Sequence, residues 1–152
     1  ENLRLLHYPA VPRPQDQEQE IVRGAVHTDF GTLTLLTQDS VGGLRAQRLD
    51  GQWVHVSPVD NSIVVNVGDM LQRWSNDTLR ATPHQVVELS SNDDGTMIPE
   101  RFSIAFFCNA NKNVMLHCLQ HCQSEAPKYS PIKAHDYLIR RLSETISKEA
   151  SA

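Results

Sequence analysis

The sequence predicts a mainly β protein, a sandwich or barrel of short strands followed by one long helix. Short runs rich in apolar and β-branched residues recur at close spacing and are separated by turn residues, which is typical of sandwiches and barrels. Near the C-terminus, Leu138, Leu142 and Ile146 recur at four-residue spacing. This apolar stripe predicts a helix over residues 134–148.

The strand candidates are bounded by turn signals. Asp50-Gly51 predicts a hairpin because both residues tolerate positive φ. Pro9–Glu20 carries three prolines and then polar residues, so we expect a solvated loop there. Asp69 is expected to cap a short helix that runs to Ser75. The strand candidates are Leu3–His7, Ile21–Asp29, Leu33–Gln38, Leu44–Leu49, Trp53–Ser57, Ser62–Val67, His84–Ser90 and Arg101–Cys108.

Bulk composition describes one ordinary globular domain of 152 residues. The net charge is −4 and the basic residues are scattered, which argues against nucleic-acid binding. No apolar run approaches the roughly 18 residues that span a bilayer. Three cysteines do not predict a disulfide framework, and a reducing, cytoplasmic location fits best. Because the sequence opens at Glu1 directly in a predicted strand, we expect that an N-terminal segment precedes it.

The candidate metal ligands are His27, Asp29 and His84. Residues two apart on a strand project to the same face, so His27 and Asp29 can reach one ion together. His84 follows after 54 intervening residues and would arrive from a distant strand. Two imidazoles and one carboxylate occupy one face of an octahedral ion and leave the other positions open, as in non-haem Fe(II) oxygenases. Taken alone, the His-x-Asp pattern also fits a surface turn.

A candidate anion site lies in the last strand. Arg101 and Ser103 share one face of it, while Phe102, Ile104 and Phe106 occupy the other, where we expect packing. An inward-facing arginine is costly unless it meets an anion, and its planar fork can grip a carboxylate. A buried structural ion pair is the alternative interpretation of this motif alone.

Several motifs follow one another along the chain: residues 27–36 (HTDFGTLTLL), 41–44 (VGGL), 66–70 (NVGDM), 74–76 (WSN), His84 and residues 101–104 (RFSI). In this order they resemble the C-terminal catalytic domain of the isopenicillin-N-synthase-like Fe(II)- and 2-oxoglutarate-dependent dioxygenases. The resemblance runs from about Leu3 to Tyr137. It implies a double-stranded β-helix (jelly roll) with a C-terminal helix, as a single catalytic domain over residues 1–152 that lacks the family's N-terminal helical region.

The same resemblance implies roles for individual residues. His27, Asp29 and His84 would bind Fe(II), and Arg101 and Ser103 would bind the remote carboxylate of 2-oxoglutarate.

Two further positions match the family less completely. Tyr8 matches a tyrosine that donates a hydrogen bond to the cosubstrate, although Leu6 stands where the family often has asparagine. Phe107 matches a position that often touches substrate, with core packing as the alternative.

The implied activity is that of an oxidoreductase. It would hydroxylate, desaturate or rearrange a small organic metabolite of secondary metabolism, using Fe(II), 2-oxoglutarate and O2, with release of succinate and CO2. Ascorbate would serve as reductant in vitro. Two rivals stay open: a same-fold iron oxidase that does not use 2-oxoglutarate, against which Arg101 and Ser103 argue, and a non-catalytic jelly-roll module.

A second cluster of metal-ligating residue types lies between His117 and Cys122. Its four side chains are crowded into six residues without a second pair at a distance, so we expect a connecting segment rather than a structural zinc site.

Overall fold

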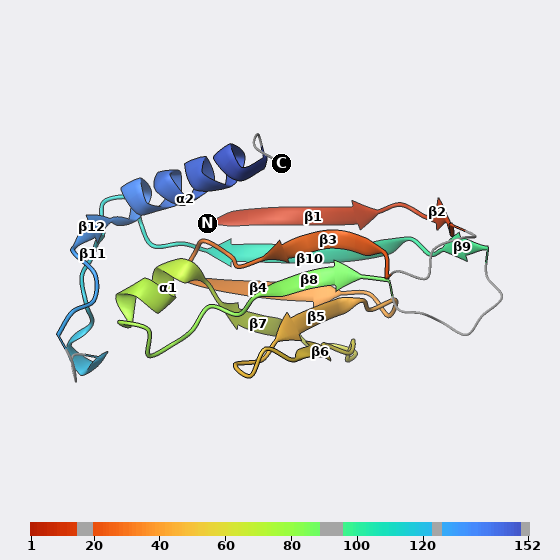
Figure 1. Cartoon of the computed structure of the whole chain (residues 1–152), viewed down its shortest axis with the longest axis horizontal. Coiled ribbons are helices and arrows are strands. Elements are labelled where there is room, and N and C mark those ends of the chain that lie inside the picture. The colour runs from red at the N-terminus through yellow and green to blue at the C-terminus, as the bar shows by residue number, and fades with distance from the viewer. Residues whose placement is uncertain (15–19, 89–95, 123–125, 150–152) are drawn as a thin grey trace.

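The computed structural model describes residues 1–14, 20–88, 96–122 and 126–149, with residues 146–149 placed by their backbone alone. Two four-stranded antiparallel sheets lie one in front of the other (Figure 1). The first sheet, in the order β1-β10-β4-β7, contains β1 (Asn2–Tyr8), β10 (Arg101–Cys108), β4 (Leu33–Gln38) and β7 (Val64–Val67). The second, in the order β3-β8-β5-β6, contains β3 (Val22–His27), β8 (His84–Val87), β5 (Leu44–Gln47) and β6 (Trp53–His55). This jelly roll confirms the predicted fold class.

The chain passes back and forth between the two sheets, so strands far apart in the sequence become neighbours. β1 pairs with β10, and this register sets Tyr8 opposite Arg101. β3 pairs with β8, and this register sets His27 opposite His84. The pairing of distant strands therefore decides which polar side chains meet.

The eight predicted strands are present, and several are shorter than the sequence suggested. Residues 89 and 90 of the predicted strand His84–Ser90 and part of the predicted loop Pro9–Glu20 lie outside the described residues. The rest of that loop needs correction, because Val11–Pro12 forms β2 and pairs with β9 (Met97–Ile98). Burial of Ile98 gives this short pairing an apolar contact that the polar composition of the loop did not indicate.

Two helices flank one end of the sheets (Figure 1). α1 spans Asp69–Trp74 and α2 spans Ala134–Glu149, close to the predicted bounds. The predicted cap of α1 is wrong: Gly68 is the N-cap, and the Asp69 carboxylate instead accepts a 2.7 Å hydrogen bond from Arg141 on α2.

A buried cluster joins these helices to the segment between them. It contains Met70, Leu116, Ala134 and Tyr137. The segment carries β11 (Met115–Leu116), β12 (Ile132–Lys133) and a single 3-10 turn (Gln120–Cys122). No helix in the described part of the chain has the length and apolar character needed to cross a membrane.

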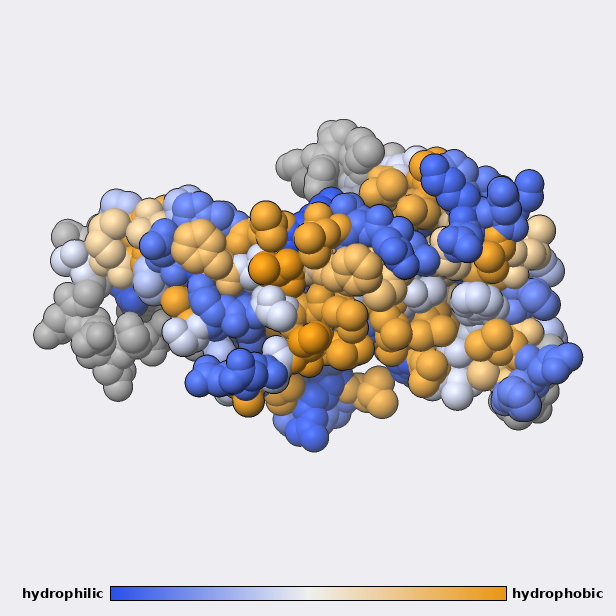
Figure 2. Space-filling view, turned by 180° about the vertical axis from the view of Figure 1, so that it is seen from behind, coloured by the Kyte–Doolittle hydropathy of each residue, from blue (hydrophilic) through white to orange (hydrophobic). Residues whose placement is uncertain are grey.

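The outer face of the first sheet departs from expectation. Phe102 and Ile104 were expected to pack, yet they are 49% and 44% exposed, and Phe106 is half-buried. Alternation along β10 turns them away from the interior, and no described element covers them. Leu3 and Leu5 on β1 are exposed beside them. Figure 2 shows hydrophobic residues gathered across this side of the molecule.

Candidate active site

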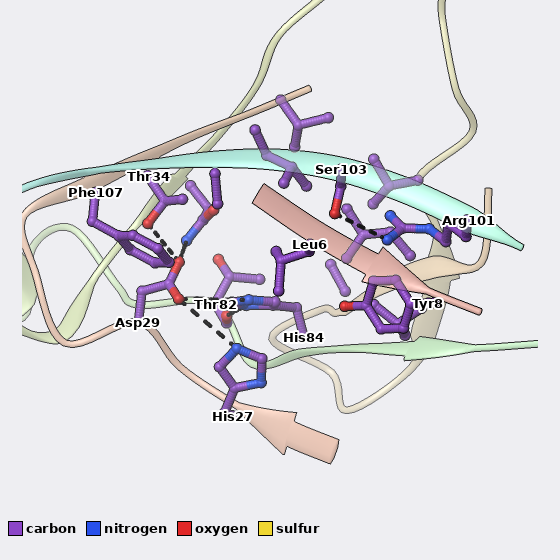
Figure 3. A pocket seen from close by; sticks show the side chains of 18 residues that line it. Leu6, Tyr8, His27, Asp29, Thr34, Thr82, His84, Arg101, Ser103 and Phe107 are labelled. Atoms are coloured by element: carbon purple, nitrogen blue, oxygen red, sulfur yellow. Dashed lines mark hydrogen bonds and ion pairs between the residues drawn. The ribbon is translucent and has the colours of Figure 1, made fainter. Parts of the chain in front are cut away.

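Three metal-ligating side chains meet at one end of the space between the sheets (Figure 3). His27 is the last residue of β3, His84 is the first of β8, and Asp29 lies two residues beyond the end of β3 rather than on the strand. Oδ1 of Asp29 lies 3.9 Å from Nε2 of His27 and 3.8 Å from Nε2 of His84. One ligand atom from each residue lies within 4.8 Å of the other two.

Backbone carbonyls fix the orientation of both imidazoles. Nδ1 of His27 lies 2.8 Å from the carbonyl oxygen of Ala25, and Nδ1 of His84 lies 3.0 Å from that of Thr82. Because a carbonyl can only accept, each Nδ1 carries the proton and donates it. Each Nε2 is then left with a lone pair directed at the space beside Asp29, which is the tautomer that a metal ligand needs.

The Asp29 carboxylate is held from one side. Its Oδ2 accepts a 2.6 Å hydrogen bond from the Thr34 hydroxyl and a 2.8 Å bond from the Asn66 amide. Asp29 is only 7% exposed, so these two donors offset part of the cost of burying its charge. Oδ1 is left facing the two histidines.

The loop that carries Asp29 is bonded to the start of α1. The amide of Asp69 donates a 2.7 Å bond to the carbonyl of Asp29, and the amide of Gly68 donates to Thr32. A Cβ on Gly68 would lie 2.4 Å from the carbonyl oxygen of Gly31. Only glycine permits this approach, so Gly68 sets the position of the loop and thereby of Asp29.

Arg101 lies further along the same interior and is only 3% exposed. Its Nε donates a 2.6 Å bond to the carbonyl of Gly42, and its terminal nitrogens donate to Ser103 Oγ at 3.2 Å and Gln38 Oε1 at 3.0 Å. The Tyr8 ring lies 5.1 Å from the guanidinium carbon. A guanidinium has five N–H groups, so one remains on each terminal nitrogen for a further acceptor.

No carboxylate forms an ion pair with Arg101 in the described part of the chain, although Tyr8 and then Asp39 lie near enough to favour its charge. Burial lowers the pKa of the guanidinium below its ordinary value. Such a cation gains from an anion that enters the cavity beside it. Arg101 therefore does not form the structural ion pair that the sequence motif left open as an alternative.

Two adjoining cavities reach the histidine–aspartate cluster. The inner cavity, of about 110 Å³, lies between the sheets and extends from the cluster to Tyr8, Arg101 and Ser103. The outer cavity, of about 290 Å³, lies on the other side, toward β1 and α2. The residues that line both are His27, Asp29 and Phe107.

The donor set fits a divalent transition metal with open positions. Two imidazole nitrogens and one carboxylate oxygen converge, and the cavities leave room for further ligands. Among the described residues this is the only such group of three, so His117, Cys118, His121 and Cys122 do not form a second one.

Several residues of the site were missed by sequence reasoning. Thr34 and Asn66 support Asp29, and Gln38 supports Arg101. A signal existed for Asn66, because it is the one polar residue of the otherwise apolar strand β7. Leu138 and Leu142 of α2 line the outer cavity. The apolar stripe of this helix predicted the helix itself but did not show that it lies against the metal site.

Jelly-roll sheets that enclose two histidines, an aspartate and an inward arginine define a non-haem iron oxygenase domain. The model of the 2OG-Fe(II) oxygenase superfamily matches residues 1–110. The chain belongs to this superfamily, whose members use Fe(II), 2-oxoglutarate and O2.

Known proteins are similar to this chain over nearly its whole length. The 2-oxoglutarate-Fe(II) type oxidoreductase hxnY of Emericella nidulans is 42% identical over 88% of this chain and 37% of its own length. Proline hydroxylase buaE of Petromyces alliaceus is 43% identical over 94% of this chain and 46% of its own. Full-length T7H of Neurospora crassa, crystallised with alpha-KG and thymine, superposes with a TM-score of 0.84 at 42% identity, covering 94% of this chain and 44% of that one. The chain thus spans less than half the length of each.

Proposed function

We propose that this domain is the catalytic part of a dioxygenase that oxidises a small organic molecule with Fe(II), 2-oxoglutarate and O2. One observation carries the proposal. Two imidazole nitrogens and one carboxylate oxygen face a cavity whose far end holds the buried cation of Arg101. A metal at one end and a cation at the other suit a short dicarboxylate that binds both.

In this proposal His27, Asp29 and His84 hold Fe(II), which supplies the redox chemistry with O2 when bound. Arg101 offers its two remaining N–H groups to the remote carboxylate of 2-oxoglutarate, and Ser103 adds its hydroxyl. The two carbonyl contacts of the imidazoles and the two donors to Asp29 keep the ligand atoms aligned without a contribution from the cosubstrate.

Tyr8 and Phe107 take secondary roles. The Tyr8 hydroxyl lines the inner cavity beside Arg101, where it would donate a further hydrogen bond to the cosubstrate. Phe107 lines both cavities, and it would contact the substrate while excluding water from the metal.

A small-molecule substrate is supported by two relatives, one named a proline hydroxylase and one crystallised with thymine. Decarboxylation of 2-oxoglutarate to succinate and CO2 would consume one oxygen atom of O2, and the second would hydroxylate the substrate. Desaturation, or a rearrangement that also removes two hydrogen atoms from the substrate, would instead release the second oxygen atom as water. A cytoplasmic location is supported by the cysteine count of three, which does not suit a disulfide framework, and a place in secondary metabolism by the relatives' names.

Binding and turnover test the proposal separately. Calorimetry without oxygen measures affinity for Mn(II), a redox-stable substitute for Fe(II), and then for 2-oxoglutarate. Succinate is then measured after incubation with Fe(II), ascorbate, 2-oxoglutarate and a panel of small metabolites. His84→Ala should abolish metal binding and succinate formation. His55→Ala, which removes an exposed imidazole from β6, should change neither.

Other outcomes of these measurements would support one of the two alternative functions. Iron-dependent oxidation that is indifferent to 2-oxoglutarate would identify a same-fold iron oxidase. Failure of the folded chain to bind Mn(II) would identify a non-catalytic module and overturn the proposal.

A further inference from the structure

The outer cavity carries an inference that rests on the proposed function and deepens it. It adjoins the metal cluster through His27 and Asp29, on the side away from Arg101. If 2-oxoglutarate fills the inner cavity, the outer one offers a further space that reaches the metal. Its walls should therefore describe the substrate.

Most of the wall is apolar. Phe30 lies beside the metal-binding loop, Phe107 comes from β10, and Leu138 and Leu142 come from α2. Such surfaces favour the flat or aliphatic body of a small molecule over a strongly hydrated one.

One charged side chain other than the metal ligands lines this cavity. Arg4 projects from β1, and its guanidinium carbon lies 5.7 Å from the centre of the Phe107 ring. No hydrogen bond or ion pair of this guanidinium occurs within the described part of the chain. By contrast, Arg45 and Arg141 each meet a carboxylate. Arg4 is thus a solvent-exposed cation without a counter-ion, at the wall of a cavity that reaches the metal site.

Two amides border the same cavity, those of Asn2 and Asn109. They can accept or donate, but they do not neutralise a cation. Asp29 supplies the one carboxylate in the lining, and its Oδ2 is already bonded to Thr34 and Asn66. An anionic oxygen group is the complement to this cation that the lining does not supply.

We propose that Arg4 anchors the substrate, and that the substrate is a small organic acid with an apolar body. Its carboxylate would accept hydrogen bonds from the Arg4 fork while its body lies against Phe107 and the leucines of α2. The carbon to be oxidised would then lie at the end away from the carboxylate, toward His27 and Asp29. Arg4 would set both affinity and the position of attack.

The test uses a library of small carboxylic acids, each paired with its neutral primary amide. Ligand-observed NMR measures their binding to the chain saturated with 2-oxoglutarate and either Zn(II) or paramagnetic Mn(II). Extra line broadening with Mn(II) identifies ligands that lie beside the metal. We expect acids to bind in preference to their amides, and Arg4→Gln to weaken the acids by about tenfold or more while sparing amides.

Two variants make the result specific. Arg48→Gln removes an exposed arginine elsewhere and should leave acid binding unchanged. Leu142→Trp fills the outer cavity and should block acids beside the metal without affecting 2-oxoglutarate. Normal Mn(II) and 2-oxoglutarate binding with no preference for acids, or with acid binding that survives Arg4→Gln, would overturn this inference alone. Loss of Mn(II) or 2-oxoglutarate binding in the unaltered chain would overturn the proposed function as well.

Discussion

The side-chain amide of Asn66 on β7 donates a 2.8 Å hydrogen bond to Oδ2 of Asp29, which lies 37 positions earlier in the chain. The bond runs between the first sheet and the loop after β3, and it occupies the carboxylate oxygen that does not face the histidines. This hydrogen bond therefore links the position of the metal ligand Asp29 to the packing of β7, a strand that carries no metal ligand.

Replacing Asn66 should weaken metal binding without removing a ligand. In Asn66→Ala the Asp29 carboxylate keeps only the Thr34 donor and can rotate away from His27 and His84. We expect Mn(II) affinity, measured by calorimetry, to fall by about 10- to 100-fold. Asn113→Ala, an exposed amide on another segment, should leave it unchanged. A change of less than about threefold in Asn66→Ala would show that the bond does not align the ligand.

Gly68 offers a test of the same centre through the backbone. In Gly68→Ala the new methyl would lie 2.4 Å from the carbonyl oxygen of Gly31 and 2.9 Å from that of Asp29, so the loop must move. We expect a loss of about 1 to 3 kcal/mol in the free energy of unfolding by urea, together with weaker Mn(II) binding. Gly24→Ala is the matched control, because its methyl meets Val86 at ordinary contact distances of 3.4 Å and more. Equal stability of the two variants would contradict this account.

Much of the architecture could be predicted because strand periodicity is local. Alternation correctly placed Arg101 and Ser103 on the inner face of β10, and the four-residue spacing located α2. The same rule gave no information on what covers the opposite face, so packing was wrongly expected for Phe102 and Ile104. Periodicity determines the side to which a residue points, but not whether another element lies there.

The supporting contacts could not be predicted, because they depend on how the sheets are layered. Gln38 reaches Arg101 across 63 positions, and Thr34 reaches Asp29 only because the loop turns back after β3. Arg4 gave no sequence signal at all. Its proposed role follows only from its place in the wall of the outer cavity, between β1 and α2.

Gln38 should affect cosubstrate binding and leave the metal alone. Its Oε1 accepts from Arg101, and its own amide donates a 3.1 Å bond to the carbonyl of Val56, so it positions the guanidinium. We expect Gln38→Ala to weaken 2-oxoglutarate binding by about five- to twentyfold at saturating Mn(II), with Mn(II) affinity unaltered. Gln52→Ala removes an exposed amide in the β5–β6 turn and serves as control. Parallel losses in both affinities would mean that Gln38 supports the sheet rather than Arg101.

Tyr137 links the packing of α2 to alkaline stability. Burial, followed by the nearby Asp69 carboxylate, raises the pKa of Tyr137 from 10.0 to about 12. The folded state therefore keeps the phenolic proton more tightly than the unfolded state. The resulting stability is fully present below pH 10 and is lost as the pH rises toward 12, to a total of about 2 to 3 kcal/mol.

Tyr137→Phe removes the titrating hydroxyl while keeping the ring among Met70, Leu116 and Ala134. Urea unfolding at pH 9 and pH 11.5 should show the unaltered chain losing about 2 kcal/mol more than the variant over this interval. All other alkaline effects are common to both proteins and cancel in the difference. If the two lose stability in parallel, the hydroxyl ionises equally in the folded and unfolded states, and its burial against α1 does not hold the proton.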